Sequence, residues 1–440
     1  MHSDGQELGL TGTIRDAARP LRTPADLDPL LEHIGSARFV LLGEASHGTS
    51  EFYRWRTAIT RRLVEEREFS FVAVEGDWPD CYCVNRFVKR LHESAESAEQ
   101  VLHAFARWPT WMWANREVVE LVEFLRGHNA RHSWDRQVGF YGLDVYSLWE
   151  SMAAVIEYLE RIDPDAARLA RRNYGCFDRF HGSAEEYARS TALTPTSCEN
   201  DVVKMLATLR SHTPDYLADG RDDYFDAEQN ALIAIDAERY YRAMIRGGPL
   251  SWNVRDHHMM DTLERLMEHH GPTAKAIVWE HNTHVGDARF TDMARDGMVN
   301  VGQLARQSHE EDGVVLVGFS TYRGSVIAAR EWGAPMERMP VPEAREGSFE
   351  DLAHRSGAGD AFLLFSEDLE KNPELEQPLG HRAIGVVYRP GGERWGNYVP
   401  TIVPHRYDAM IYIDETTAVD PLHMPVAVSA DEPETYPSGM

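Results

Sequence analysis

The chain contains several short runs of apolar residues, each ended by a glycine or by a charged residue. The clearest runs lie at 39–42, 71–74, 138–143 and 276–279. They are continuous rather than alternating, which is typical of parallel strands that are buried on both faces. The segments between the first three runs are long enough for helical crossovers. The pattern therefore predicts an α/β fold, with a mainly parallel central sheet flanked by helices.

A different pattern occupies the middle of the chain. From about residue 149 to residue 271 the strand-like runs disappear, and Ala, Leu, Arg, Glu and Tyr recur at helical spacing. Phe225, Leu232 and Ile235, for example, fall on one helical face. We expect a helical insertion here. The predicted organisation is an N-terminal tail and lead-in helix (1–34), the first half of the α/β core (35–148), the insertion (149–271), the second half of the core (272–417) and a mobile C-terminal tail (418–440).

Strand signals return in the last third of the chain. We expect strands at 314–317, 325–328, 384–388 and 410–413, because each is a short apolar run. The stretch 331–377 is rich in Pro, Gly and charged residues and is predicted to loop over the surface.

Composition narrows the class of partner. The 440 residues are 43% hydrophobic, which allows a large core, and their formal net charge is −26. Such a charge argues against nucleic acid and anionic membranes and favours a neutral or cationic small molecule. No apolar stretch approaches the ~18 residues of a membrane span, and the polar N-terminus lacks a signal peptide. We therefore expect a cytoplasmic protein.

The four cysteines give no sign of a metal site. Cys81 and Cys83 are too close together for a usual zinc pair, and no second pair follows them. We expect these two residues, together with Cys176 and Cys198, to be reduced, as is usual in the cytosol.

Acids and histidines follow the predicted strands where each strand ends. The carboxyl ends of parallel strands share one edge of a sheet, and open α/β sheets bind their ligands there. We therefore expect a catalytic cleft at this edge, with the helical insertion as the wall for an apolar substrate. The residues at the strand ends are Glu44, His47, Glu75, Asp77, Asp144, Glu280, His281 and His284.

Glu44 and His47 form the most informative pair. Gly43 and Gly48 bracket them and allow a tight turn of the backbone. A carboxylate can fix the tautomer of an imidazole and raise its basicity, which makes the histidine a general base near neutral pH. Arg56 follows about two turns into the next predicted helix, where it could hold a carboxylate or stabilise an oxyanion.

Several familiar catalytic motifs are absent from the sequence. There is no G-x-S-x-G elbow, since the stretch 318–324 lacks the spacing, and there is no H-E-x-x-H, Walker loop or G-x-G-x-x-G. Two chemistries remain: water activated by a histidine without a covalent intermediate, or a metal-dependent hydrolase. A binding protein without turnover is a third possibility. The candidate metal ligands would be Glu44, His47, Glu75, His281 and His284.

The motifs together resemble the erythromycin esterase family over roughly residues 38–414. The resemblance rests on LLGEASHGTSEFYRWR, FVAVEGDWP, GLDVYSLW, KAIVWEHNTHVGD and GFSTYRGSV. It implies hydrolysis of a small-molecule ester or macrolide lactone by histidine-activated water, with no cofactor and no essential metal. By resemblance His47 is the base, Glu44 orients it, and Arg56, Glu75 and His284 complete the catalytic set.

Five further residues are candidates for substrate binding. Asp77 and Trp78 follow the second strand, and His281 follows a later one. Trp111 belongs to the WPTWMW cluster, which could face an apolar ligand or pack in the core. Arg255 lies on a predicted helix of the insertion, where it could border the cleft or face solvent.

Overall fold

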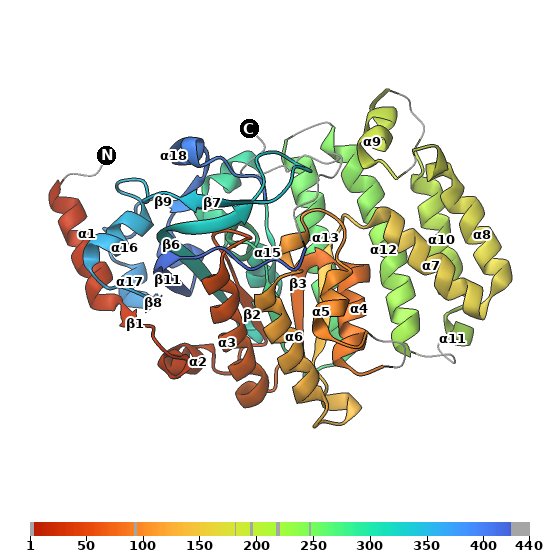
Figure 1. Ribbon diagram of the computed structural model, residues 1–440, viewed down its shortest axis with the longest axis horizontal. Helices are drawn as coiled ribbons and strands as arrows, with labels where there is room; N and C mark the ends of the chain where they lie inside the picture. Colours follow the sequence, from red (N-terminus) through yellow and green to blue (C-terminus); the bar gives the residue numbers. More distant parts are fainter. Residues whose placement is uncertain are drawn as a thin grey trace.

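A twisted sheet lies at the centre of the molecule (Figure 1). The structure is a computed structural model that describes residues 4–423 apart from 92–94, 181, 194–196, 217–220 and 246–247. Neighbouring strands follow the order β1-β8-β11-β6-β2-β5-β3-β4, and β7 pairs with β6. The strands are β1 (Arg19–Pro20), β2 (Phe39–Leu42), β3 (Phe71–Asp77), β4 (Gly139–Asp144), β5 (Ala276–Trp279), β6 (Val314–Ala328), β7 (Glu337–Val341), β8 (Ala361–Leu364) and β11 (Ala409–Thr416). β9 (Leu379–Arg382) and β10 (Tyr398–Thr401) form a separate pair.

Six neighbouring strands, from β11 to β4, are parallel, and only β1, β7 and β8 join the described sheet antiparallel. Alternate residues of β2 enter different cores: Val40 and Leu42 pack on one face of the sheet, Phe39 and Leu41 on the other. Both faces are thus apolar, which explains the continuous apolar runs. The predicted α/β class with a mainly parallel sheet is confirmed.

Helices cover both faces of the sheet. The core with Val40 is closed by α2 (Asp28–Ile34), α3 (Ser50–Arg67), α4 (Trp78–Val88), α5 (Ala98–His103) and α6 (Arg116–Asn129). The core with Phe39 is closed by α1 (Asp4–Ala17), α13 (Pro249–His270), α15 (Val301–Ser308) and α16 (Phe349–Ser356). The shorter helices are α14 (Asn282–Val285), α17 (Glu367–Glu370), α18 (Glu393–Gly396) and α19 (Val403–Arg406).

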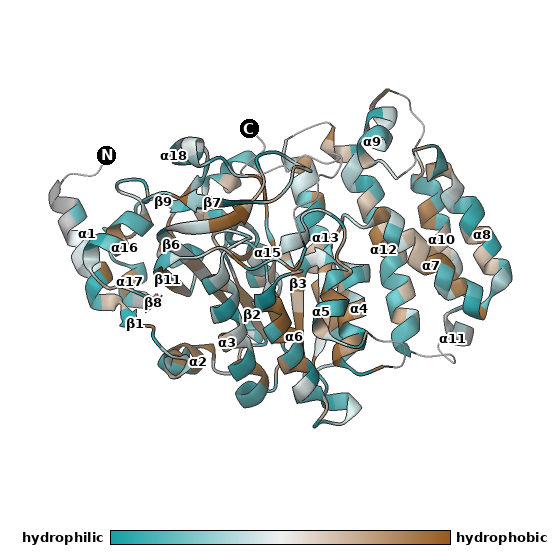
Figure 2. Cartoon of the chain, in the orientation of Figure 1, coloured by the Kyte–Doolittle hydropathy of each residue, from teal (hydrophilic) through white to brown (hydrophobic). Residues whose placement is uncertain are grey.

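The segment between β4 and β5 consists of helices in its described part; α13 lies near the middle of Figure 1, and the others gather at its right. Its members besides α13 are α7 (Leu148–Ile162), α8 (Pro164–Tyr174), α9 (Ala184–Leu193), α10 (Glu199–Ser211), α11 (Thr213–Tyr216) and α12 (Arg221–Met244). They enclose an apolar cluster of their own. Figure 2 shows apolar and hydrophilic stretches on each of the long ones. Among the described helices, none combines the length and apolarity that crossing a bilayer requires.

Two predictions about the second half of the core are wrong, and one is confirmed with a difference. The stretches 314–317 and 325–328 are strand as predicted, but they belong to one long strand, β6. The stretch 384–388 is not a strand but makes two isolated bridges, Ile384 to Ser46 and Val387 to Ala329. The segment 331–377 is not only loop, since it contains β7, α16 and β8. β7 exists because it pairs with the end of β6, a partner that its own sequence does not reveal.

The chain ends also differ from expectation. Most of the predicted N-terminal tail is helix α1, whose Leu10 and Ile14 are buried in the core. The C-terminal tail was expected from residue 418, but Val419 is buried and donates its backbone N–H to Gly48. Residues 424–440 lie outside the described part of the chain.

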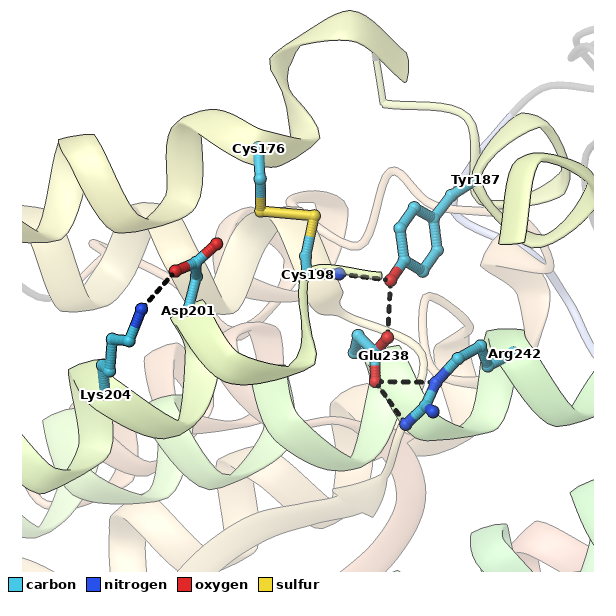
Figure 3. Close-up of a disulfide and its surroundings, with 7 residues drawn as sticks. All are labelled: Cys176, Tyr187, Cys198, Asp201, Lys204, Glu238 and Arg242. Carbon is cyan, nitrogen blue, oxygen red and sulfur yellow. Dashed lines mark hydrogen bonds and ion pairs between the residues drawn. A yellow bond between two sulfur atoms is a disulfide. The ribbon is translucent and has the colours of Figure 1, made fainter. Parts of the chain in front are cut away.

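The prediction that all four cysteines are reduced is wrong for two of them. Cys176 and Cys198 form a disulfide within the helical segment, with Cα atoms 6.0 Å apart (Figure 3). The Tyr187 hydroxyl accepts a hydrogen bond from the Cys198 N–H and donates one to Glu238. The cysteines are 22 residues apart, and only the packing of the intervening helices brings them together. Cys81 and Cys83 are free thiols.

Candidate active site

The turn after β2 holds Glu44 and His47 in contact. Glu44 Oε1 lies 2.9 Å from His47 Nδ1, and both side chains are buried. The bracketing glycines are required by close packing. A Cβ on Gly43 would lie 2.1 Å from Asn282 Oδ1, and one on Gly48 would lie 2.0 Å from the Ile327 carbonyl oxygen. Neighbouring atoms thus leave no room for a side chain at either glycine, and the tight turn between them holds Glu44 and His47 together.

Arg56 supports Glu44 from behind. Its Nη2 lies 2.6 Å from Glu44 Oε2, and its guanidinium stacks over the rings of Tyr53 and Trp279, at 4.4 and 4.5 Å from their centroids. The side chain is fully buried and does not line the pocket described below. The structure does not bring Arg56 to the pocket where an oxyanion would form, because its Nη2 is paired with the Glu44 carboxylate beside His47.

Glu75, at the end of β3, is the centre of the site. Its Oε1 lies 2.7 Å from Arg255 Nη2, 3.5 Å from His284 Nε2 and 4.0 Å from His47 Nε2. Its Oε2 accepts the backbone N–H of His281 at 2.8 Å. Burial would raise the pKa of Glu75, but His284, His47 and Arg255 outweigh it and hold that pKa well below its usual range. Glu75 is thus an ionised carboxylate that joins the two histidines.

Arg255 links the strand ends to α13. Its Nε and Nη2 bind the carboxylate of Asp144, at 2.9 and 2.7 Å, and its Nη1 lies 3.1 Å from His284 Nε2. The other nitrogen of His284, Nδ1, lies 2.9 Å from Asp256 Oδ1. Both nitrogens of His284 therefore have partners, and its ring stacks on Trp252 with centroids 4.6 Å apart.

A pocket of about 60 Å³ opens onto this network. Since a cavity of ~10–15 Å³ holds one water, it has room for several. The five predicted site residues that line the pocket are His47, Glu75, Asp77, Asp144 and Arg255. The other lining residues are Gly76, Asp80, Phe105, Arg107, Trp108, Pro109, Met112, Trp113, Tyr146, Trp332 and Val386. His284 and His281 lie behind this layer.

Two predicted substrate-binding tryptophans do not reach the pocket. Trp78 is fully buried, stacks on Tyr82 and Tyr141, and donates its indole N–H to Asp226 at 2.7 Å. Trp111 is 1% exposed and belongs to the core beneath α6. Both predictions are wrong because the two rings turn towards the core. Trp108 and Trp113, which belong to the WPTWMW cluster with Trp111, do line the pocket.

His281 is also set back from the predicted substrate position. It is fully buried, and its ring centroid lies 4.8 Å from that of His47. Burial, together with the nearby His47, lowers its pKa well below the usual value, so the ring is neutral. Its Nδ1 lies 2.8 Å from Thr283 Oγ1, and it is not among the residues that line the pocket. The ring therefore packs against that of His47 rather than facing the pocket.

Several residues of the site carried no clear signal in the sequence. Arg107 forms a two-point ion pair with Asp77, with Nη2 3.0 Å from Oδ1. Asp256 orients His284, and its position directly after Arg255 was the available hint. Asp80 lies one helical turn beyond Asp77 and lines the pocket, but no motif in its local sequence marks it.

Glu280 follows β5 as expected but is not among the residues that line the pocket. It is 1% exposed, and neither carboxyl oxygen has a hydrogen-bond partner within the described part of the chain. Burial raises the pKa of Glu280 well above its usual value, and the charges of Glu75 and Asp256 add to the effect. The shift favours the neutral carboxylic acid over the carboxylate.

Comparison with known proteins decides the family. The model of the erythromycin esterase family matches residues 64–416. The chain belongs to the erythromycin esterase family. The match begins after Glu44, His47 and Arg56, so those residues rest on the geometry given above. As a member of this family, the protein is a hydrolase.

Relatives of this erythromycin esterase family member are distant in sequence. An erythromycin esterase type II of Escherichia coli is 22% identical over 80% of this chain and 86% of its own. A putative hydrolase of Bacillus subtilis, YbfO, is 20% identical over 89% of this chain and 86% of its own.

Solved structures share the fold. A succinoglycan biosynthesis protein has a TM-score of 0.77 at 22% identity, with 95% of this chain and 100% of that one covered. A mutant of the erythromycin esterase EreC, in its open conformation, has a TM-score of 0.68 at 16% identity, covering 92% of this chain and 100% of that one. At such identities these likenesses establish the architecture alone.

Proposed function

We propose that the protein hydrolyses a carboxylic ester of a small molecule, of the macrolide-lactone type, by water that His47 activates. The observation that carries the proposal is the buried Glu44–His47 pair at the pocket wall. With Nδ1–H donating to the Glu44 carboxylate, Nε2 carries the lone pair that takes a proton. Nε2 lies 4.0 Å from Glu75 Oε1, a separation that one water bridges. That water is the proposed nucleophile.

Arg255 is the proposed stabiliser of the transition state. Attack on the carbonyl carbon creates a tetrahedral oxyanion, and a fixed positive group in a dry site stabilises it strongly. Arg255 lines the pocket and is held by Glu75 and Asp144. Burial opposes its charge, but Asp144 and Glu75 raise its pKa well above the usual value, so the guanidinium stays charged. We assign to Arg255 the oxyanion-stabilising role that the sequence suggested for Arg56.

The lining of the pocket supports direct attack by water. It includes no serine, threonine or cysteine among the described residues, so the usual acyl-forming nucleophiles are not at hand. Glu75 is a weak candidate nucleophile, because its charge is shared with Arg255 at 2.7 Å. We therefore propose direct addition of water: water bonds to the carbonyl carbon while His47 Nε2 takes its proton. The tetrahedral oxyanion then collapses, the ester C–O bond breaks, and His47 gives that proton to the departing oxygen, which leaves as the alcohol.

Isotope labelling tests both parts of the proposal. The protein would be incubated with macrolides and p-nitrophenyl esters, and mass spectrometry would detect the gain of one water. A single turnover in ¹⁸O-water with enzyme in excess should place the label in the product acid. Unlabelled acid in that first turnover would show that an enzyme carboxylate, not water, attacks the carbonyl. Absence of hydrolysis across the panel would reject the ester class tested.

A further inference from the structure

Aromatic rings make up much of the active-site pocket. Phe105, Trp108, Trp113, Tyr146 and Trp332 all line it. The Trp108 indole N–H donates to the carbonyl of Ala334 at 2.9 Å, and that of Trp113 donates to the carbonyl of Glu75 at 3.0 Å. These two rings therefore offer only carbon surface to a ligand. Aromatic carbon faces attract both apolar groups and cations, the latter through the ring quadrupole.

The charges of the pocket do not balance. Arg255 pairs with both Glu75 and Asp144, and Arg107 forms the two-point pair with Asp77. These three carboxylates thus face two guanidiniums, which leaves one negative charge in excess. The remaining lining carboxyl, Asp80, forms no ion pair or hydrogen bond with any described residue. Burial raises the pKa of Asp80 to about 7, and the neighbouring charge of Asp77 adds to the rise. A positive group beside Asp80 would favour the ionised carboxylate.

We propose that the physiological substrate is an ester bearing an alkylammonium group, which binds between Asp80 and the aromatic rings. The inference rests on the proposed function and adds the chemical class of the substrate. Apolar rings beside a carboxylate complement a bulky, weakly hydrated cation, and would disfavour an anion or a strongly polar neutral group. The net charge of −26 would also attract such a substrate from solution.

The test compares two esters of nearly equal shape. Acetylcholine carries a trimethylammonium group, and 3,3-dimethylbutyl acetate replaces its nitrogen by carbon. We expect wild-type kcat/KM to favour acetylcholine by about tenfold or more, the size of one cation–π and charge contact. In Asp80→Asn this ratio should fall towards one. The ratio cancels the concentration of folded enzyme, so partial loss of protein does not affect it.

A matched control removes the same charge elsewhere. Glu120 is exposed on α6, away from the residues that line the pocket, and Glu120→Gln should keep the wild-type ratio. An equal fall in both variants would mean that net charge, not Asp80, selects the cation. A wild-type preference for the neutral ester, or a ratio that Asp80→Asn leaves intact, would overturn the proposal.

A binding measurement separates this inference from the proposed hydrolysis. Benzyltrimethylammonium would be titrated calorimetrically into wild type and into Asp80→Asn. We expect binding to wild type and at least about tenfold weaker binding to the variant. This result would support the cation site even if neither ester were hydrolysed, which would count only against the proposed function. Equal binding to both proteins, or none to wild type, would overturn the cation site whatever the hydrolysis results.

Discussion

Arg56 and Glu44 form a fully buried ion pair, with Nη2 2.6 Å from Oε2, on the side of the carboxylate away from His47. The pair fixes Glu44 between a guanidinium and an imidazole. One carboxylate can thus hold the base in a single tautomer without itself facing the substrate. The arrangement connects an arginine two turns into α3 to His47 through Glu44, although Arg56 does not line the pocket.

Removing Arg56 should cost stability as well as activity. Arg56→Met leaves Glu44 as an uncompensated buried charge, and we expect a loss of about 3–5 kcal/mol in the free energy of unfolding. Adding Glu44→Gln should recover part of that loss, because the unpaired charge is then gone. Urea unfolding of the two single variants and the double variant measures the coupling. Additive effects of the two substitutions would show that the pair does not act as a unit.

Glu280 should make stability depend on pH in a definite direction. The unfolded state ionises this carboxyl above about pH 4.5, whereas the folded state keeps it protonated because its pKa is raised. Folding then takes up a proton, so this group lowers stability as pH rises above its unfolded pKa. Glu280→Gln mimics the neutral acid and carries no such cost. We expect the free energy of unfolding of the variant to rise relative to that of wild type as pH rises, by up to about 1.4 kcal/mol per pH unit.

Urea unfolding of both proteins at about pH 5 and about pH 8 measures this gain. Titrating groups shared by the two proteins cancel in the comparison. The exposed Glu120→Gln variant is the control and should show no such trend with pH. A difference between Glu280→Gln and wild type that stays constant, or that shrinks as pH rises, would show that Glu280 is ionised in the folded protein.

The parts of the fold that follow from local sequence were predictable. β2 spans residues 39–42 as expected, because a short continuous apolar run that ends at Gly43 is typical of a parallel strand buried on both faces. Glu44 and His47 followed from their place after that run. The disulfide and β7 were not predictable, since each depends on a partner supplied by tertiary packing.

The site shows the same division between local and distant information. The contact between Arg255 and Glu75 joins residues 180 positions apart, and no local pattern reports such a distance. Trp78 and Trp113 are both buried, at 0% and 4% exposure, yet only Trp113 lines the pocket. The residue type alone cannot distinguish these two tryptophans, because the helix or turn that carries each one sets the direction of its ring.

Chelation should leave the activity intact. Arg255 Nη2 lies 2.7 Å from both Glu75 and Asp144, so a guanidinium occupies the position between these acids that a divalent cation would need. Assays after dialysis against EDTA, with and without added Zn²⁺, Mn²⁺ or Mg²⁺, would check this expectation. Activity that disappears with the chelator and returns with one of these ions would favour the metal-dependent mechanism instead.

The most direct test of the account is the kcat/KM of His47→Ala on an ester that wild type hydrolyses. Loss of a general base costs about 10²–10⁴ in rate, so we expect a fall of at least about 10² while the protein remains folded. His33→Ala, at an exposed position of α2, is the matched control and should behave as wild type. If His47→Ala keeps more than about a tenth of wild-type kcat/KM, His47 is not the base and the proposed mechanism is wrong.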